Sequence, residues 1–222
     1  MVNGYSDRRE AGRRLGRLLA ERRLDGVVVI GLPRGGVIVA AEVARALGAP
    51  LDVVVVRKLG LPMAPEVAMG AIAEGGIRSL DTDLIARHRV AADELALVEL
   101  RERRTLLARS ALLRGGRAAE PLDGRVAVVV DDGVATGATA RVACRAVRRR
   151  GTARVVLAVP VAAASALRQL ALDGTGGAPH EIVCPLALEP FGAVGRYYAG
   201  FEPVDDDEVV RALAEAGGGV RR

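Results

Sequence analysis

The sequence predicts an α/β protein built on a doubly wound parallel sheet. Three observations lead to this fold class: valine-rich runs of strand length, helical patterns that alternate with them, and turn residues at their ends. Uninterrupted apolar runs of this kind are typical of strands covered on both faces. Strands that alternate with helices form parallel sheets with right-handed crossovers. With 222 residues, half of them hydrophobic, the chain is long enough for one full core.

Five strands and four helices are expected in this core. Each strand stops at a glycine, a proline or a charged residue, and the strands cover residues 27–31, 53–57, 126–131, 154–159 and 181–185. The helices have apolar residues three and four positions apart, at residues 8–23, 37–47, 139–150 and 162–172. We expect a single domain over residues 1–216, followed by a frayed tail at residues 217–222.

An insertion at residues 60–122 separates the second and third core strands. A loop rich in glycine and proline opens it, and two apolar runs, residues 67–73 and 77–80, flank Glu74-Gly75-Gly76 as in a β-hairpin. A helical pattern then runs from about residue 91 to residue 113 and stops at Gly115-Gly116. This long helix fits either a contact between copies in a homo-oligomer or a support for a lid, and the pattern favours neither.

The most informative stretch of the chain joins a strand to two acids. Four valines and an alanine at residues 126–130 lead directly into Asp131 and Asp132. Open α/β sheets bind ligands at the carboxyl ends of their strands, so both carboxylates should face a ligand. Neighbouring carboxylates are unfavourable to bury without hydroxyl donors, a metal or water in front of them. We therefore expect Asp131 and Asp132 to hold the hydroxyls of a polyol.

The turn that follows the acids suits a phosphate. Its residues are small or carry a hydroxyl, and they stand where a helix begins: Ala135, Thr136, Gly137, Ala138 and Thr139. Successive backbone N–H groups at a helix N-terminus bind phosphate dianions. An acid pair suited to a polyol, next to a turn suited to a phosphate, indicates that the ligand is a phosphorylated sugar. The competing G-x-x-x-x-G-K-[ST] phosphate loop is absent from the sequence.

A second anion-binding loop follows the first predicted strand. Gly35 and Gly36 let backbone N–H groups approach an anion, and Arg34 adds a forked donor suited to phosphate oxygens. Lys58 is the only lysine of the chain and closes the second predicted strand, where a compact ammonium reaches a phosphate. Arg57, beside it, is a further candidate.

Together these segments resemble type I phosphoribosyltransferases. The acid pair with residues 135–139 is similar to the ribose-phosphate signature of that family, and residues 34–36 are similar to its pyrophosphate loop. Arg57-Lys58-Leu59-Gly60-Leu61-Pro62 resembles the segment that opens the flexible loop of adenine-type members, although a second lysine is missing. Nearly the full length is similar to bacterial members of unassigned substrate.

The resemblance implies transfer of phosphoribose from phosphoribosyl pyrophosphate (PRPP) to a nitrogenous base, with release of pyrophosphate and with Mg²⁺ held mainly by the substrate. It assigns the ribose hydroxyls to Asp131 and Asp132 and the 5′-phosphate to residues 135–139. It assigns the pyrophosphate to Arg34, Gly35, Gly36, Lys58 and Arg57. A mobile loop or hairpin that closes over the reacting centre is also implied. The alternative is a regulator that senses PRPP or a nucleotide without turnover and binds RNA.

The acceptor base is defined less closely than the donor. The resemblance places Ala135 where 6-oxopurine enzymes have an acid that handles the base proton, so Glu66, or else Glu74, is the candidate for that role. The family covers the base with a hood of terminal segments, expected here at about residues 186–210. Rings in this region either stack on a base or pack as a small core, and the predicted base-binding residues are Phe191, Tyr197 and Tyr198.

Composition limits the remaining classes of function. The net charge is +5, but the arginines are spread over several predicted helices, which is typical of a solvated surface rather than a nucleic-acid binding stripe. The longest uncharged apolar stretch, residues 155–167, contains Pro160 and is too short to span a bilayer. No secretion signal opens the sequence, and its two cysteines lie far apart, so we expect a cytoplasmic protein with reduced cysteines.

Overall fold

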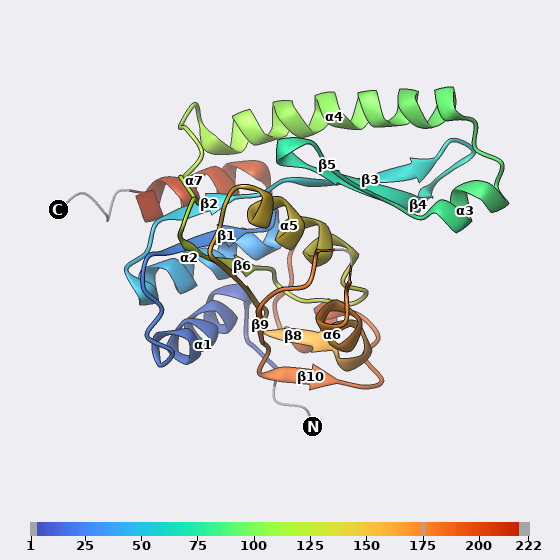
Figure 1. Cartoon of the computed structure of the whole chain (residues 1–222). Coiled ribbons are helices and arrows are strands. Elements are labelled where there is room, and N and C mark those ends of the chain that lie inside the picture. Colours follow the sequence, from blue (N-terminus) through green and yellow to red (C-terminus); the bar gives the residue numbers. More distant parts are fainter. Residues whose placement is uncertain (1–3, 175, 218–222) are drawn as a thin grey trace.

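The central layer of the protein is a five-stranded parallel sheet. A computed structural model describes residues 4–174 and 176–217. The strands, in their order across the sheet, are β2 (Leu51–Val53), β1 (Val27–Gly31), β6 (Val126–Val130), β7 (Arg154–Ala158) and β9 (Glu181–Val183). Every neighbouring pair is parallel, and helices lie on both sides of the layer (Figure 1). The predicted doubly wound parallel sheet is confirmed.

Helices cover both faces because alternate strand residues point to opposite sides of the sheet. On one face, Val29 of β1 shares a core with helices α1 (Arg8–Ala20), α2 (Gly35–Leu47) and α7 (Asp206–Gly217). On the other face, Val28 and Ile30 share a core with α5 (Ala138–Arg149) and α6 (Ala164–Ala171). Among the helices that the structure describes, none combines the length and the apolar character needed to cross a membrane.

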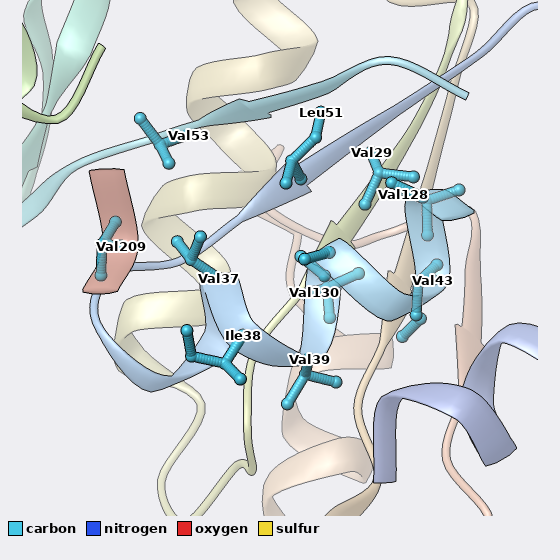
Figure 2. Close-up of a cluster of buried hydrophobic side chains, with 14 of the residues drawn as sticks. Val29, Val37, Ile38, Val39, Val43, Leu51, Val53, Val128, Val130 and Val209 are labelled. Carbon is cyan, nitrogen blue, oxygen red and sulfur yellow. The ribbon is translucent and has the colours of Figure 1, made fainter. Parts of the chain in front are cut away.

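Valine side chains form much of the contact between α2 and the sheet (Figure 2). Val37 and Val43 of the helix and Val29 and Val130 of the strands are fully buried in one cluster, with Val209 of α7 at its edge. Burying a valine side chain stabilises the fold by roughly 1.5–3 kcal/mol. This packing fixes α2, and with it the loop that precedes α2, against the ends of β1 and β6.

The second predicted strand is wrong in its bounds. One strand was expected at residues 53–57, but β2 ends at Val53 and a new strand, β3 (Val56–Leu61), belongs to a different sheet. Between them the Val55 N–H donates to Oε1 of Glu74 at 3.0 Å. A run of four valines shows no alternation from which such a break can be recognised.

Residues 56–114 form an arm beside the central sheet (Figure 1). In this arm β3 pairs antiparallel with β4 (Ala64–Ala73), and β4 pairs with β5 (Ile77–Leu80). The short helix η1 (Glu74–Gly76) joins β4 to β5, which confirms the predicted hairpin. After α3 (Thr82–Arg87) comes the predicted long helix, α4 (Ala92–Arg114), along the outer side of the three strands.

The C-terminal part contains elements that the sequence analysis did not predict. Strands β8 (Val161–Ala163) and β10 (Leu186–Leu188) form a separate parallel pair. Because β8 takes the first residues of the helix expected at 162–172, α6 is shorter than predicted. The expected hood includes β10 and η2 (Val194–Tyr197), and its end is the start of α7. Of the expected tail, Gly217 ends α7, and residues 218–222 lie outside the described residues.

A buried arginine fastens the arm to the central sheet. Arg114, the last residue of α4, donates from Nε to Oδ1 of Asp52 and from Nη1 to Oε2 of Glu74, both at 2.8 Å. It also donates to the Ser110 hydroxyl and to the Val53 carbonyl oxygen. Burial lowers the pKa of Arg114, but the two carboxylates outweigh burial and leave this pKa above its ordinary value. The arm is therefore tied to β2 through one charged cluster.

Replacing Arg114 by methionine should destabilise the protein by about 3–5 kcal/mol, because Asp52 and Glu74 would lose a buried partner. The free energy of unfolding from urea titration measures the loss. Arg101→Met is the matched control, since Arg101 is exposed on the same helix and has no ion-pair partner within the described residues. Its expected change is below about 0.5 kcal/mol. Equal losses in the two variants would contradict the anchoring role of Arg114.

Candidate functional site

The two loops that contain the predicted site residues lie side by side. Strands β1 and β6 are neighbours, with Gly31 opposite Val130 at their carboxyl ends. From β1 the chain continues to β2 on one side, and from β6 it continues to β7 on the other. Loops that leave neighbouring strands in opposite directions form the crevice in which doubly wound proteins bind ligands. The site predicted from the sequence therefore lies at the topological switch point of the sheet.

Two glycines allow direct contact between these loops. A Cβ atom on Gly35 would lie 2.0 Å from Oδ2 of Asp132. A Cβ atom on Gly36 would lie 2.8 Å from Cα of Asp131. At Gly36 the contacts include backbone atoms, so only glycine sets the loop after β1 directly against the acid pair there, whereas a side chain on Gly35 would displace the Asp132 carboxylate and its Arg8 partner.

Asp132 is held by a residue that the sequence analysis missed. Arg8, in the first turn of α1, donates from Nε to Oδ2 of Asp132 at 2.8 Å, and both side chains are largely buried. The Arg8 guanidinium also donates to the Glu202 carbonyl oxygen at 2.8 Å and lies 3.8 Å from the centre of the Phe201 ring. The Tyr198 hydroxyl donates to the Asp132 carbonyl oxygen. Since 124 positions separate Arg8 from Asp132, no local sequence pattern could have indicated the pair.

Asp131 is the acid whose ionisation is perturbed. Burial raises the pKa of Asp131 well above its ordinary value, and the neighbouring Asp132 carboxylate raises it further. The Asp132 N–H, which donates to Oδ1 of Asp131 at 2.9 Å, and the Arg8 charge act in the opposite direction. A carboxylate with so little solvation gains strongly from hydrogen-bond donors that a ligand brings.

The turn after the acids presents a row of backbone donors. The Val134 N–H is used, because it donates to the Val161 carbonyl oxygen at 3.0 Å. The N–H groups of residues 135–140 have no acceptor within the described part of the chain. Gly137 has a φ of 79°, and α5 begins at the next residue with no side chain accepting from its first turn. The residues predicted to bind phosphate thus form one open helix N-terminus.

Arg34 and Lys58 both have exposed side chains near these loops. Arg34 directly precedes α2, and Lys58 lies in β3. Neither has an ion-pair partner among the residues that the structure describes. A pocket of about 320 Å³ between the arm and α5 is lined by Lys58 and Thr139, among others. The arm therefore brings the single lysine next to the turn at residues 135–139.

Arg57 and Glu74 are engaged in ion pairs that hold the arm together. Arg57 donates from Nε to Oε2 of Glu102 in α4 at 2.7 Å, and Glu74 binds Arg114. Consecutive strand residues point to opposite faces, so Arg57 and Lys58 face different sides of β3. The pyrophosphate role predicted for Arg57 and the proton-transfer role predicted for Glu74 do not fit these contacts. Glu66 is exposed at the start of β4, and its role stays a prediction.

The rings predicted to bind a base pack mainly on one another. Phe191 and Tyr197 stack at a centroid distance of 5.1 Å, and the Tyr197 hydroxyl donates to the Phe191 carbonyl oxygen at 2.7 Å. Tyr198 stacks on Phe201 at 5.0 Å. Phe191 and Tyr198 are both buried, so for these two rings the small-core interpretation fits better than base stacking. Together with the bond from Tyr198 to Asp132, the cluster fastens the C-terminal segment to the acid loop.

Metal ligands and reactive thiols do not define this site. Within residues 4–174 and 176–217, no group of three or more His, Cys, Asp or Glu side chains is arranged to hold a metal ion. Cys144 and Cys184 are free thiols, and burial raises their pKa values to about 12 and about 11. The polar groups that the structure brings together in the crevice are the acid pair and the backbone donors, with Arg34 and Lys58 nearby.

Comparison with known proteins shows the family to which the chain belongs. A model of the phosphoribosyl transferase domain matches residues 2–171. The chain belongs to this family. Two Mycobacterium tuberculosis proteins, from strains CDC 1551 / Oshkosh and H37Rv, are each named "Putative phosphoribosyl transferase" and are 47% identical over 212 residues. The match covers 96% of this chain and 47% of theirs, so the chain spans about half the length of these relatives.

Solved structures show how widely the fold of this phosphoribosyl transferase domain is shared. A Thermus thermophilus protein has a TM-score of 0.80 and 43% identity, over 97% of this chain and 100% of its own. An Aquifex aeolicus protein has a TM-score of 0.51 and 13% identity, over 81% of this chain and 73% of its own, and its similarity concerns the fold alone.

In this phosphoribosyl transferase domain, Asp131→Asn should raise the Tm at neutral pH. A carboxyl whose pKa is raised on folding stabilises the protein only while protonated, so that stability is present below the unfolded pKa and lost as pH rises through the folded pKa. Asparagine cannot ionise, so the variant does not lose this stability as the pH rises. The Tm difference from wild type should be largest at neutral pH and shrink towards about pH 4.

Thermal melts over this pH range check the prediction, with Asp25→Asn as the control for removing one aspartate charge, since Asp25 is exposed. A Tm difference for Asp131→Asn that does not vary with pH would show that its pKa is not raised by folding.

Proposed function

We propose that this domain transfers the 5-phosphoribosyl group of PRPP to a nitrogenous base and releases pyrophosphate. One observation carries the proposal: the glycine loop after β1 touches the acid pair after β6, next to an open helix N-terminus. The glycine loop suits a pyrophosphate, the acid pair suits a sugar diol, and the helix N-terminus suits a terminal phosphate. Membership of the phosphoribosyl transferase family supports the reaction class and leaves the acceptor open.

The acid pair would bind the ribose and stabilise its charge. Asp131 and Asp132 would accept hydrogen bonds from the 2′- and 3′-hydroxyls, each contributing roughly 1.5–3 kcal/mol. Arg8 and Tyr198 already hold Asp132 by its side chain and its carbonyl, so the acceptor atoms are in place before the ligand arrives. As the bond from C1′ to the pyrophosphate oxygen breaks, positive charge develops on the sugar, and the nearby carboxylates favour it.

The leaving group would be bound by the loop after β1 and by the arm. Backbone N–H groups of residues 35–36, the Arg34 guanidinium and the Lys58 ammonium are the donors proposed for the pyrophosphate. Mg²⁺ would neutralise charge on the departing oxygens. The described residues offer no cluster of three ligands, so the cation would take most of its oxygen ligands from PRPP and water.

The acceptor nitrogen would form the new bond to C1′ and lose a proton. Ala135 offers no acid for that proton, which is why we retain Glu66 of the arm as the proposed acceptor. Tyr197, the partly exposed ring among the three predicted, is the one retained for the base. An arm that closes over the crevice would exclude water, which otherwise competes with the base for the sugar.

Incubation with PRPP, Mg²⁺ and a panel of purine and pyrimidine bases tests the reaction. Wild type should release pyrophosphate and form a nucleotide with at least one base. Asp131→Asn and Asp132→Asn should lower kcat/KM by roughly a hundredfold, because each weakens hydrogen bonds to the diol and removes a stabilising charge. Asp25→Asn should leave it unchanged, since Asp25 is exposed and belongs to neither loop.

Calorimetric titration with PRPP separates the outcomes of this assay. Binding without turnover of any base would contradict the transferase and support the alternative, a PRPP-sensing regulator, for which salt-sensitive RNA binding is the positive sign. If PRPP does not bind at all, both proposals fail.

The two basic residues of β3 should behave differently on replacement. Lys58→Ala should raise the Kd for PRPP by at least about tenfold, because it removes a charge proposed to contact the pyrophosphate. Arg57→Ala should mainly lower the Tm, because it breaks the pair with Glu102. Titration calorimetry and thermal melts on both variants check this division. A larger loss of PRPP affinity in Arg57→Ala than in Lys58→Ala would reverse the assignment.

A further inference from the structure

The outer face of α4 carries a leucine stripe that the described residues leave uncovered. Leu97, Leu100 and Leu107 are 49%, 48% and 60% exposed. Figure 1 shows α4 at the edge of the molecule, with the three-stranded sheet on its inner side. With Asp93 and Arg104, these leucines follow alternating intervals of four and three residues. Such heptad spacing is that of helices that pack lengthwise on another helix.

The opposite face of α4 already has its partner. Leu106 and Leu113 are buried against the rest of the protein. A helix with an apolar stripe on one side buries that stripe and leaves the other side polar. Because α4 has leucines on both sides, its inner contacts leave part of its apolar surface uncovered. The outer leucines form a contiguous stripe, which is the kind of surface that marks an interface.

The charged residues of α4 also differ between its inner and outer faces. Those that face the protein are used in ion pairs with other elements, namely Glu99–Arg78, Glu102–Arg57, Arg109–Asp206 and Arg114–Asp52. Asp93 and Arg104 are exposed within the leucine stripe, and neither has an ion-pair partner in the described part of the chain. They stand on either side of the pair formed by Leu97 and Leu100.

We propose that a second copy of this chain packs its α4 antiparallel along this stripe. A two-fold axis midway between Leu97 and Leu100 sets Leu97 against the partner's Leu100. The same axis sets Asp93 against the partner's Arg104. Because the contact is symmetric, Leu100 also meets the partner's Leu97, and Arg104 meets the partner's Asp93. The stripe is therefore complementary to a second copy of itself. The result is a leucine layer with an ion pair at each end.

Charge selects this orientation over the parallel one. In a parallel pair, each Asp93 would face the partner's Asp93 and each Arg104 the partner's Arg104, and like charges at such positions are destabilising. The antiparallel register removes both repulsions.

The surface beside the stripe has room for a partner. The 23 residues of α4 form a helix about 34 Å long. A groove of about 680 Å³ opens between α4 and the strands β3 and β4, and Leu97, Arg101 and Pro65 are among its lining residues. A partner helix on the stripe would cover the rim of this groove, which adds area to the contact. Because α4 packs on β3, the dimer would also join the two arms.

Sedimentation equilibrium of the full chain tests the proposal. Wild type should approach twice the 23.1 kDa monomer mass as concentration rises through the micromolar range. Leu100→Glu should raise the dimer dissociation constant at least tenfold, without lowering the Tm measured at concentrations where wild type is also monomeric. Leu172→Glu is the matched control, because Leu172 is an 84% exposed leucine outside the stripe, and it should leave the dimer intact. A monomeric wild type, or a dimer that Leu100→Glu leaves unchanged, would overturn the proposal.

A charge exchange tests the register. Asp93→Arg and Arg104→Asp should each weaken the dimer, because each opposes like charges across the axis. The double variant, Asp93→Arg with Arg104→Asp, restores opposite charges and should return the dissociation constant towards the wild-type value. Failure of the double variant to recover would rule out the pairing of Asp93 with the partner's Arg104.

Discussion

The crevice of this domain depends on a steric constraint: two positions in the loop after β1 have no space for a side chain. Gly36 lies so close to the backbone of Asp131 that a single methyl group would force the loops apart, and a methyl group on Gly35 would displace the Asp132 carboxylate from Arg8. The parallel pairing of β1 with β6 places the loops together, and the valine packing under α2 holds them there. Backbone donors, carboxylates and an open helix end consequently share one small space, as the proposed chemistry requires.

Within that space the two acids have different environments. Asp132 has a fixed orientation, because Arg8 holds its carboxylate and Tyr198 its carbonyl oxygen. Asp131 has few partners, and burial raises its pKa. Holding a poorly solvated carboxylate beside another one opposes folding, and such unfavourable arrangements are characteristic of ligand sites. The packed rings of the C-terminal segment support the crevice directly, because Tyr198 belongs to them, and the buried Arg114 of the arm stabilises it from a distance.

The sequence was sufficient wherever the signal was local. The strands at β1 and β6, the hairpin, the long helix and the grouping of the acid pair with the following turn all follow from short runs of residues. Long-range features were not accessible: Arg8 reaches Asp132 across 124 positions, and Arg57 and Glu74 are drawn into ion pairs with α4. The break between β2 and β3 lies inside a run of valines, where periodicity carries no information.

Helix α5 begins without the side chain that usually completes such an end, while Arg148 and Arg149 occupy its last turn. These basic side chains interact favourably with the negative, C-terminal end of the helix dipole. The first turn of α5 contains no acidic residue to do the same at the positive, N-terminal end. A phosphate bound at that end would serve as the missing cap, and caps contribute roughly 0.5–2 kcal/mol to helix stability. By thermodynamic linkage, a phosphate that binds only the formed helix end also stabilises that end, by an amount that grows with its affinity and concentration.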